Sequence, residues 1–466
     1  MDVRAHIQAN RDDFVATLSE WLTIPSVSAD PARHGDVRRS AEWLADHLRR
    51  TGFPTVEIWE TPGLPAVFAE WPAADPDAPT VVVYGHHDVQ PADPVEAWQT
   101  HPFTPTVRGD QMIGRGASDD KGQILFHTLG LRANLAASGA DAPPVTVRLL
   151  VEGEEESGSP HFADLLTRHR DRLACDVVVI SDTTMWAADT PSMCVGMRGL
   201  TDCQIDVHGP RSDLHSGSFG GAAPNPARAL AALLAGLHDA DGRVAVPGFY
   251  DEVVEASETE RASIAGLPFD EAAWLANATS DAAVGEAGYS VLERIWLRPT
   301  AEINGMWSGY TGEGGKTIVP RSAHAKLSFR LVPDQEPARI QELVRHYVRD
   351  NLPEGVRAEV RFHGPGVRPC ASDLGSAAVR AAREAMARAF GTEVRYTREG
   401  GSGPEADLAD ILDAPLVFVA VGLNSDRIHA PNEKVEIPLL LKGAETVAYL
   451  WDAYATALRD RTVEER

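Results

Sequence analysis

The chain has 466 residues and a formal net charge of -25, with 43% of its residues hydrophobic and 24% charged. A chain of this length is too long for a single hydrophobic core, so roughly two to four domains are expected. The negative charge would repel nucleic-acid backbones and anionic lipid, which argues against roles in nucleic-acid or membrane-surface binding. No apolar stretch approaches the ~20 residues that cross a bilayer, and the polar residues 1–6 lack the apolar core of a secretory signal. We therefore expect a soluble cytoplasmic protein.

The first part of the chain alternates between helical and strand-like segments. Apolar residues at helical spacing predict helices over residues 3–22 and 37–50, the second of which ends at Gly52 and Pro54. A further helix is predicted over residues 122–137. The predicted strands cover residues 56–59, 80–84, 145–151 and 176–180. Alternating strands and helices imply an α/β architecture, a sheet flanked by helices.

The pattern of polar and apolar residues changes after Asp182. Residues 200–207 and 325–331 alternate between polar and apolar side chains, which predicts strands with one solvent-facing side. The remaining predicted elements are a helix at 340–348, strands at 358–362 and 416–421, and a last helix at 439–458. The alternation of predicted strands and helices resumes near Val394. We therefore predict a discontinuous first domain of residues 1–195 and 392–466, into which an α+β domain of residues 196–391 is inserted.

Candidate ligands for metal ions follow the predicted strands. His86 and Asp88 come directly after the apolar run 81–83, so they are expected at the carboxyl edge of a sheet, where open α/β folds build active sites. A lone His-x-Asp is a weak signal, but further acids and a histidine follow strands or lie in glycine- and serine-rich loops. These are Asp119-Asp120, Glu154-Glu155-Glu156, Asp182 and His429. Together they indicate a two-metal hydrolase.

Asp119 suits the carboxylate that a dinuclear site needs between its ions, because it lies in the glycine-punctuated loop 114–122. The alternative is that Asp119 or Asp120 caps the helix that follows. The adjacent acids 154–156 repel one another unless cations or protons compensate them, although a solvated acidic turn is the alternative. Thiolate ligands are not expected, because no Cys-x-x-Cys occurs among Cys175, Cys194, Cys203 and Cys370.

Eight short motifs resemble those of the carnosinase and cytosolic non-specific dipeptidase family, in the family's order and over nearly the whole chain. They are GHHDVQP at 85–91, GRGASDDKG at 114–122, EEESGS at 154–159, ISD at 180–182, SDLHSGSFGG at 212–221, KTIVPR at 316–321, REGGS at 398–402 and IHAPNEK at 428–434. The resemblance implies a zinc-exopeptidase-like catalytic domain with a mixed sheet, and an inserted lid or dimerisation domain.

The resemblance also implies two divalent ions per chain, Zn or Mn. One ion would be held by His86, Asp182 and a bridging Asp119, and the other by Glu156, His429 and the same Asp119. Asp88 would orient His86, and Glu155 would be the general base on a hydroxide held between the ions. The peptide bond between Asp119 and Asp120 would be cis.

Two assignments depend on register. The family usually has a neutral residue where this chain has Glu154, so anchoring on Ser157-Gly158-Ser159 selects Glu155 and Glu156, and a shift of one residue is the alternative. His87 adjoins His86, and the His-x-Asp spacing selects His86.

The substrate contacts are inferred from the resemblance alone. His215 would reach across a homodimer interface to stabilise the oxyanion, and Arg330 would grip the terminal carboxylate of a dipeptide. Thr317 and Ser402 would support them as hydrogen-bond donors, and His363 is a looser match. Ordinary surface or capping roles are the alternative for each.

The predicted activity is metal-dependent hydrolysis of short peptides, most simply dipeptides with a free amino end. The main alternative is an N-acyl amino-acid amidohydrolase on the same site. Related enzymes that act on free amino termini tend to carry aspartate at the position of Asp182, whereas deacylases tend to carry glutamate, which favours the dipeptidase. A metal-binding protein that has lost turnover is a third alternative, and the presence of Glu155 and His215 argues against it.

Overall fold

The computed structural model describes residues 2–459, which divide into two compact units. The first unit contains residues 2–195, 371–397 and 403–459, and the second contains residues 196–370 and 398–402. These bounds differ from the predicted ones, because residues 371–391 lie in the first unit and residues 398–402 in the second. Helix α13 (Ala377–Phe390) buries its apolar stripe in the same core as α15 (Ile437–Ala457), so this segment belongs to the first unit.

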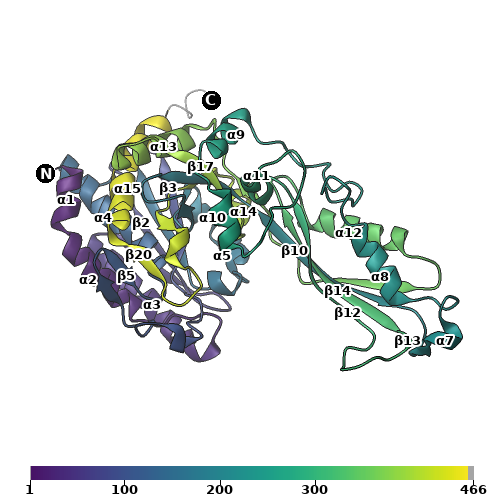
Figure 1. The fold of residues 1–466 in the computed structure, drawn as a ribbon. Helices are drawn as coiled ribbons and strands as arrows, with labels where there is room; N and C mark the ends of the chain where they lie inside the picture. The colour runs from purple at the N-terminus through teal and green to yellow at the C-terminus, as the bar shows by residue number, and fades with distance from the viewer. Residues whose placement is uncertain (1, 460–466) are drawn as a thin grey trace. The chain divides into compact units, whose positions relative to one another are not determined.

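The first unit is built on a six-stranded mixed sheet, which confirms the predicted α/β class (Figure 1). β3 runs parallel to both β6 and β7, and β18 extends the parallel part beyond β7. Near-continuous apolar runs such as Val81–Val83 are expected of strands that are buried on both faces. In spatial order the strands are β1 (Thr55–Trp59), β2 (Ala66–Trp71), β6 (Thr146–Glu152), β3 (Thr80–His86), β7 (Val177–Ile180) and β18 (Leu416–Phe418).

Helices cover both faces of this sheet. On one face, a single apolar core joins Val83 and Val179 of the sheet to helices α4 and α15, which lie side by side in Figure 1. Gly130 permits this close approach, because a Cβ there would lie 2.6 Å from the carbonyl oxygen of Ala444. On the other face, Tyr84 packs on Phe162 of α5. The helices are α1 (Val3–Ala9), α2 (Arg11–Leu22), α3 (His34–Thr51), α4 (Lys121–Ser138), α5 (Phe162–Arg168), α6 (Arg170–Leu173) and α14 (Glu405–Leu412), with the short turns η1 (Pro31–Arg33), η2 (Val95–Ala97), η3 (Glu155–Ser157) and η4 (Asn424–Asp426).

Short strands bring the late part of the chain to the sheet edge. β20 (Lys434–Glu436) pairs with β5 (Gln111–Ile113), so the loop that carries His429 is held beside the loop that carries Asp119. β8 (Thr184–Met185) pairs with β19 (Gly422–Leu423), in this case parallel. The other short strands are β4 (Thr106–Arg108), β9 (Ser192–Met197), β16 (Cys370–Ala371) and β17 (Arg395–Glu399).

The second unit contains a four-stranded antiparallel sheet with helices α8 and α12 on one face. Burial alternates along β10 and β14, as the alternating sequence predicted. The strands lie in the order β12 (Thr300–Ser308), β14 (Ser322–Leu331), β10 (Gly199–His208) and β15 (Arg357–Phe362). The remaining elements are β11 (Leu214–His215), β13 (Ile318–Val319), α7 (Ser216–Phe219), α8 (Pro226–Ala235), α9 (Glu258–Ala265), α10 (Glu271–Asn277), α11 (Val291–Trp296) and α12 (Pro337–Asn351).

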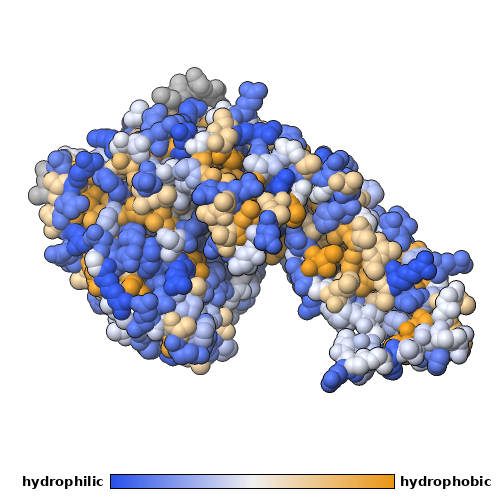
Figure 2. Space-filling model, in the orientation of Figure 1, coloured by the Kyte–Doolittle hydropathy of each residue, from blue (hydrophilic) through white to orange (hydrophobic). Residues whose placement is uncertain are grey.

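The surface agrees with the composition. Figure 2 shows that the visible face of the first unit is mostly hydrophilic, as expected for a chain with a net charge of -25. Within residues 2–459, no helix has both the length and the apolar character that a membrane span requires.

Candidate metal centre

His86 ends strand β3 and is fully buried at the carboxyl edge of the sheet. Its Nδ1 atom lies 3.0 Å from the backbone oxygen of Asp88 and 3.4 Å from the carboxylate of the same residue. Because the backbone oxygen can only accept a hydrogen bond, and the carboxylate adds negative charge nearby, they favour a proton on Nδ1 and leave the lone pair on Nε2. Nε2 lies 2.9 Å from Asp119 Oδ1 and 3.5 Å from Asp182 Oδ2. Asp88 therefore orients a ring whose free nitrogen faces two carboxylates.

Asp119 lies between two histidines. Its Oδ1 is 2.9 Å from His86 Nε2, and its Oδ2 is 2.9 Å from His429 Nε2. The peptide bond that joins Asp119 to Asp120 is cis, as the resemblance implied. A carboxylate with one oxygen toward each imidazole has the arrangement that a bridging ligand needs.

Glu156 completes a second cluster with His429 and Asp119. Its Oε2 lies 3.2 Å from His429 Nε2. Gln90 fixes this carboxylate with its backbone N–H at 3.0 Å and its side-chain amide at 2.7 Å. The backbone N–H of Glu156 donates to Asp88 Oδ2 at 3.0 Å, so Asp88 contacts the supports of both clusters.

The structure thus brings together two groups of candidate metal ligands that share Asp119. In each group the ligand atoms all lie within 4.8 Å of one another. Imidazole nitrogens with carboxylate oxygens form a donor set that suits Zn or Mn. The groups are His86, Asp119 and Asp182, and Asp119, Glu156 and His429.

The electrostatics of the site favour added positive charge. Burial raises the pKa of Asp182 to about 6 and, together with the neighbouring Asp119 charge, that of Glu156 to about 7. Burial also raises the pKa of Glu155 above its ordinary range. Hydrogen bonds to Asp119 and Glu156 raise the pKa of His429 to about 10. Buried carboxylates that hold on to protons in this way are compensated when cations bind.

His87 and Glu154, which the sequence left open as alternative site residues, contact groups outside the two ligand clusters. His87 donates from Nε2 to the carbonyl oxygen of Pro65 at 2.9 Å, and burial lowers its pKa to about 4, which keeps it neutral. The carboxylate of Glu154 lies 2.9 Å from His161 Nδ1 and belongs to neither ligand group. The geometry therefore favours His86 over His87, and the register that selects Glu155 and Glu156.

Asp120 does not cap helix α4 through its side chain. Its Oδ2 instead accepts the backbone N–H of His86 at 3.2 Å, and burial raises its pKa well above the ordinary value. Asp120 therefore ties the loop of the candidate ligand Asp119 to the end of β3.

Glu433 is a residue of the site that sequence reasoning missed. It is fully buried, and its Oε1 accepts the backbone N–H groups of Ser118 and Asp119 at 3.0 and 3.2 Å. Its Oε2 accepts from the guanidinium of Arg115 at 2.7 Å and from the N–H of Gly116 at 3.0 Å. Glu433 thus holds the backbone that carries Asp119. Its acidic character inside the IHAPNEK motif was the only available signal, because its partners lie more than 300 residues away in sequence.

The predicted substrate contacts all lie in the second unit. Arg330 on β14 donates from Nη1 to Ser402 Oγ at 3.1 Å, and Ser402 Oγ donates to the carbonyl of Arg198 at 2.5 Å. His363 is exposed and contacts Asp202 at 2.6 Å. Thr317 is exposed, and its carbonyl accepts the N–H of Ser216 at 3.0 Å. His215 is exposed at the end of β11, where its ring accepts the N–H of Gly217 at 3.0 Å.

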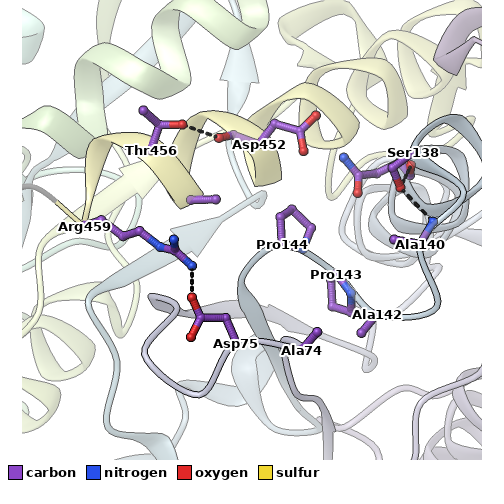
Figure 3. Close-up of a pocket in the computed structure, with 12 residues that line it drawn as sticks. Ala74, Asp75, Ser138, Ala140, Ala142, Pro143, Pro144, Asp452, Thr456 and Arg459 are labelled. Carbon is purple, nitrogen blue, oxygen red and sulfur yellow. Dashed lines mark hydrogen bonds and ion pairs between the residues drawn. The ribbon is translucent and has the colours of Figure 1, made fainter.

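A pocket of about 410 Å³ in the first unit contains none of these residues (Figure 3). Asp75 and Arg459 form an ion pair at its rim, and the rest of the lining consists mainly of small residues and prolines. The lining contains no histidine, and its Asp75 is paired with Arg459, so the candidate centre remains at the sheet edge.

Comparison with known proteins assigns the family. Residues 82–453 match the family described as Peptidase family M20/M25/M40. The chain belongs to this peptidase family. It is 30% identical to the Beta-Ala-His dipeptidase of Homo sapiens over 460 residues, which cover 95% of this chain and 90% of the relative. It is also 30% identical to the Cys-Gly metallodipeptidase DUG1 of Saccharomyces cerevisiae over 470 residues, 96% of this chain and 97% of the relative.

A solved structure supports the same assignment. The M20 family metallo-carboxypeptidase Sso-CP2 of Sulfolobus solfataricus superposes with a TM-score of 0.79 at 30% identity, covering 95% of this chain and 99% of that one. The predicted family and hydrolase class are therefore confirmed. The deacylase alternative is not favoured, because the curated relatives named above are dipeptidases.

Proposed function

We propose that this M20 enzyme hydrolyses dipeptides with a free amino end at a dinuclear site. The observation that carries the proposal is the pair of ligand groups that share Asp119. His86, Asp182 and Asp119 would hold one cation, and Glu156, His429 and the same Asp119 the other. Bound Zn or Mn ions supply Lewis acidity and lower the pKa of water, which is the chemistry that amide hydrolysis needs. The choice between Zn and Mn is left to metal analysis.

Glu155 is the proposed general base. Among the described residues no hydrogen bond engages its carboxylate, and it lies on the η3 turn beside Glu156. Its carboxylate is therefore available to take a proton from the attacking water and to return that proton to the leaving amine. Asp88 keeps the His86 ring in place while the proton moves.

The second unit would supply recognition of the substrate. Arg330 is proposed to bind the terminal carboxylate, with Ser402, Thr317 and His363 as supporting contacts. Its guanidinium forms no ion pair within residues 2–459, which supports a role toward a ligand.

We further propose a homodimer in which His215 of the partner subunit stabilises the oxyanion. Strand β12 lies at the edge of its sheet, and its side chains Ile303, Met306 and Trp307 are exposed. An edge strand with exposed apolar side chains favours pairing with a second chain. His215 is itself exposed and therefore accessible to another subunit.

A cytoplasmic location is proposed because all four cysteines are free thiols, as expected in a reducing compartment.

Metal analysis combined with a substrate panel tests the proposed activity. Dipeptides, tripeptides, N-blocked dipeptides and N-acetyl amino acids are compared, and we expect two ions per chain and preference for free dipeptides. Glu155→Gln is expected to lower kcat by about 100-fold or more while both ions are retained. Activity within twofold of the wild type would reject Glu155 as the base. Preference for N-blocked dipeptides would instead support a carboxypeptidase, the activity named for the Sulfolobus structure.

A further inference from the structure

Two arginines of the second unit lack acidic partners. Arg330 donates only to the neutral hydroxyl of Ser402, at 3.1 Å. The guanidinium of Arg198 forms no hydrogen bond or ion pair with any residue between 2 and 459, and its Nε is buried without an acceptor. Half-buried guanidinium groups are normally matched by carboxylates, so two of them without an acidic partner in one region point to an anionic ligand.

Arg198 and Arg330 lie close to each other. Leu200 of β10 lies opposite Arg330 of β14, and Arg198 directly precedes β10. Ser402 contacts both residues, and the Arg330 charge acts on Arg198.

The loop at residues 398–402 contacts the backbone of Arg198 and leaves space for its side chain. The N–H of Arg198 donates to the carbonyl of Glu399 at 3.3 Å, and the carbonyl of Arg198 accepts from Ser402 Oγ at 2.5 Å. A Cβ at Gly400 would lie 3.1 Å from Arg198 Nη2, so glycine leaves room for the guanidinium at this point. Ser402 thus contacts both arginines, the side chain of one and the backbone of the other.

The local charge is positive in a strongly acidic protein. Burial and the neighbouring Arg330 lower the pKa of Arg198 to about 10, so both groups remain cationic at neutral pH. Glu302 is the one acid that acts on Arg198, and it is exposed and makes no ion pair with it among the described residues. The site is consequently short of negative charge, and a ligand carboxylate would supply it.

We propose that Arg198 is a second carboxylate-binding residue, which shares with Arg330 the α-carboxylate at the C-terminal end of the substrate. The inference rests on the proposed dipeptidase function and extends it to a residue outside the motifs found in the sequence. Planar guanidinium groups suit this role because each can donate in parallel to carboxylate oxygens. An enzyme built in this way requires a free carboxylate on the substrate.

The test compares Ala-Ala with its C-terminal amide, Ala-Ala-NH2, on the metal-loaded enzyme. The wild type should prefer the free carboxylate, and Arg198→Gln should reduce this preference by about 10- to 100-fold, mainly through KM, as expected for a hydrogen bond between charged groups. Arg198→Lys keeps the charge without the planar fork and should lie in between. Arg357→Gln, at an exposed position of β15, is the matched control and should leave the preference unchanged.

Equal losses on both substrates would show that Arg198 is only structural, and an unchanged preference in Arg198→Gln would show that it does not touch the carboxylate. Calorimetric binding of a reduced-bond analogue of Ala-Ala, and of the amide of that analogue, gives the same comparison without turnover. If the wild type hydrolysed no dipeptide, the proposed function would fail, and this binding ratio would still decide the role of Arg198.

Discussion

Replacing Glu433 by glutamine removes the negative charge that faces Arg115 inside the first unit, and we expect this change to weaken both folding and metal binding. Glu433 is fully buried and Arg115 is 1% exposed, so water cannot compensate the charge that is left. Burial raises the pKa of Glu433 despite the nearby guanidinium, which shows that desolvation offsets much of the attraction. Removal of one partner nevertheless leaves an unpaired buried charge, at a cost of about 3–5 kcal/mol.

The free energy of unfolding, measured by urea titration of the metal-free protein, gives the first readout. Metal affinity gives the second readout. The carboxylate of Glu433 now accepts the backbone N–H groups of residues 116, 118 and 119, and the amide of glutamine would instead turn an N–H group toward one of these donors. Mutation of residues that orient metal ligands typically costs 10- to 100-fold in affinity. We expect a loss in that range for Glu433→Gln.

Glu445→Gln is the matched control. Glu445 is also a nearly buried acid that pairs with basic residues, but its partners Arg4 and Lys442 have side chains that are 60% and 33% exposed. Solvent can therefore replace the lost interaction, and the expected loss is about 1 kcal/mol or less. If Glu433→Gln lost no more stability than this control, or bound metal as tightly as the wild type, the account of the Asp119 loop would be refuted.

Three further predictions concern catalysis, pH and assembly. His215→Ala should lower turnover while two ions per chain remain by elemental analysis, and loss of metal would make His215 a ligand instead. Burial lowers the pKa of His47 to about 4 and that of His127 to about 3, so below pH 6.5 the unfolded chain binds protons that the folded chain does not. The contribution of each histidine to stability should be complete above about pH 6.5 and fall by about 1.4 kcal/mol per pH unit toward pH 4, so the pH dependence of His127→Gln should differ from that of the wild type by this amount. Met306→Asp on β12 should shift sedimentation from dimer to monomer, and a wild type that sediments as a monomer would reject the proposed homodimer.

Local signals predicted much of the first unit. The apolar run before His86 identified the end of β3, and the buried strand there agrees with that reading. The helix predicted over residues 3–22 proved to be two helices that meet at Asn10, whose side chain donates to the carbonyl of His6. Helical spacing continues across this junction, so periodicity alone does not reveal the break.

Long-range features were beyond sequence reasoning. The direction of Glu154 depends on His161 and on an irregular turn, for which no periodic signal exists. Helix α13 has the same apolar spacing whichever unit it joins, and only its packing against α15 decides the matter. Glu433 and Arg198 were missed because their surroundings are formed by segments far away in the chain.

The first unit combines residues from the beginning and the end of the chain, so it can be completed only late in synthesis. Strand β18 at residues 416–418 covers the edge of β7, and His429 follows it, so almost the whole polypeptide must be synthesised before either is available. Until then, β7 is an open edge strand of the sheet in the nascent chain, paired only with β3. A ribosome that stalls before residue 416 would therefore hold an inactive, aggregation-prone fragment, and chaperone binding during this interval is the expected protection.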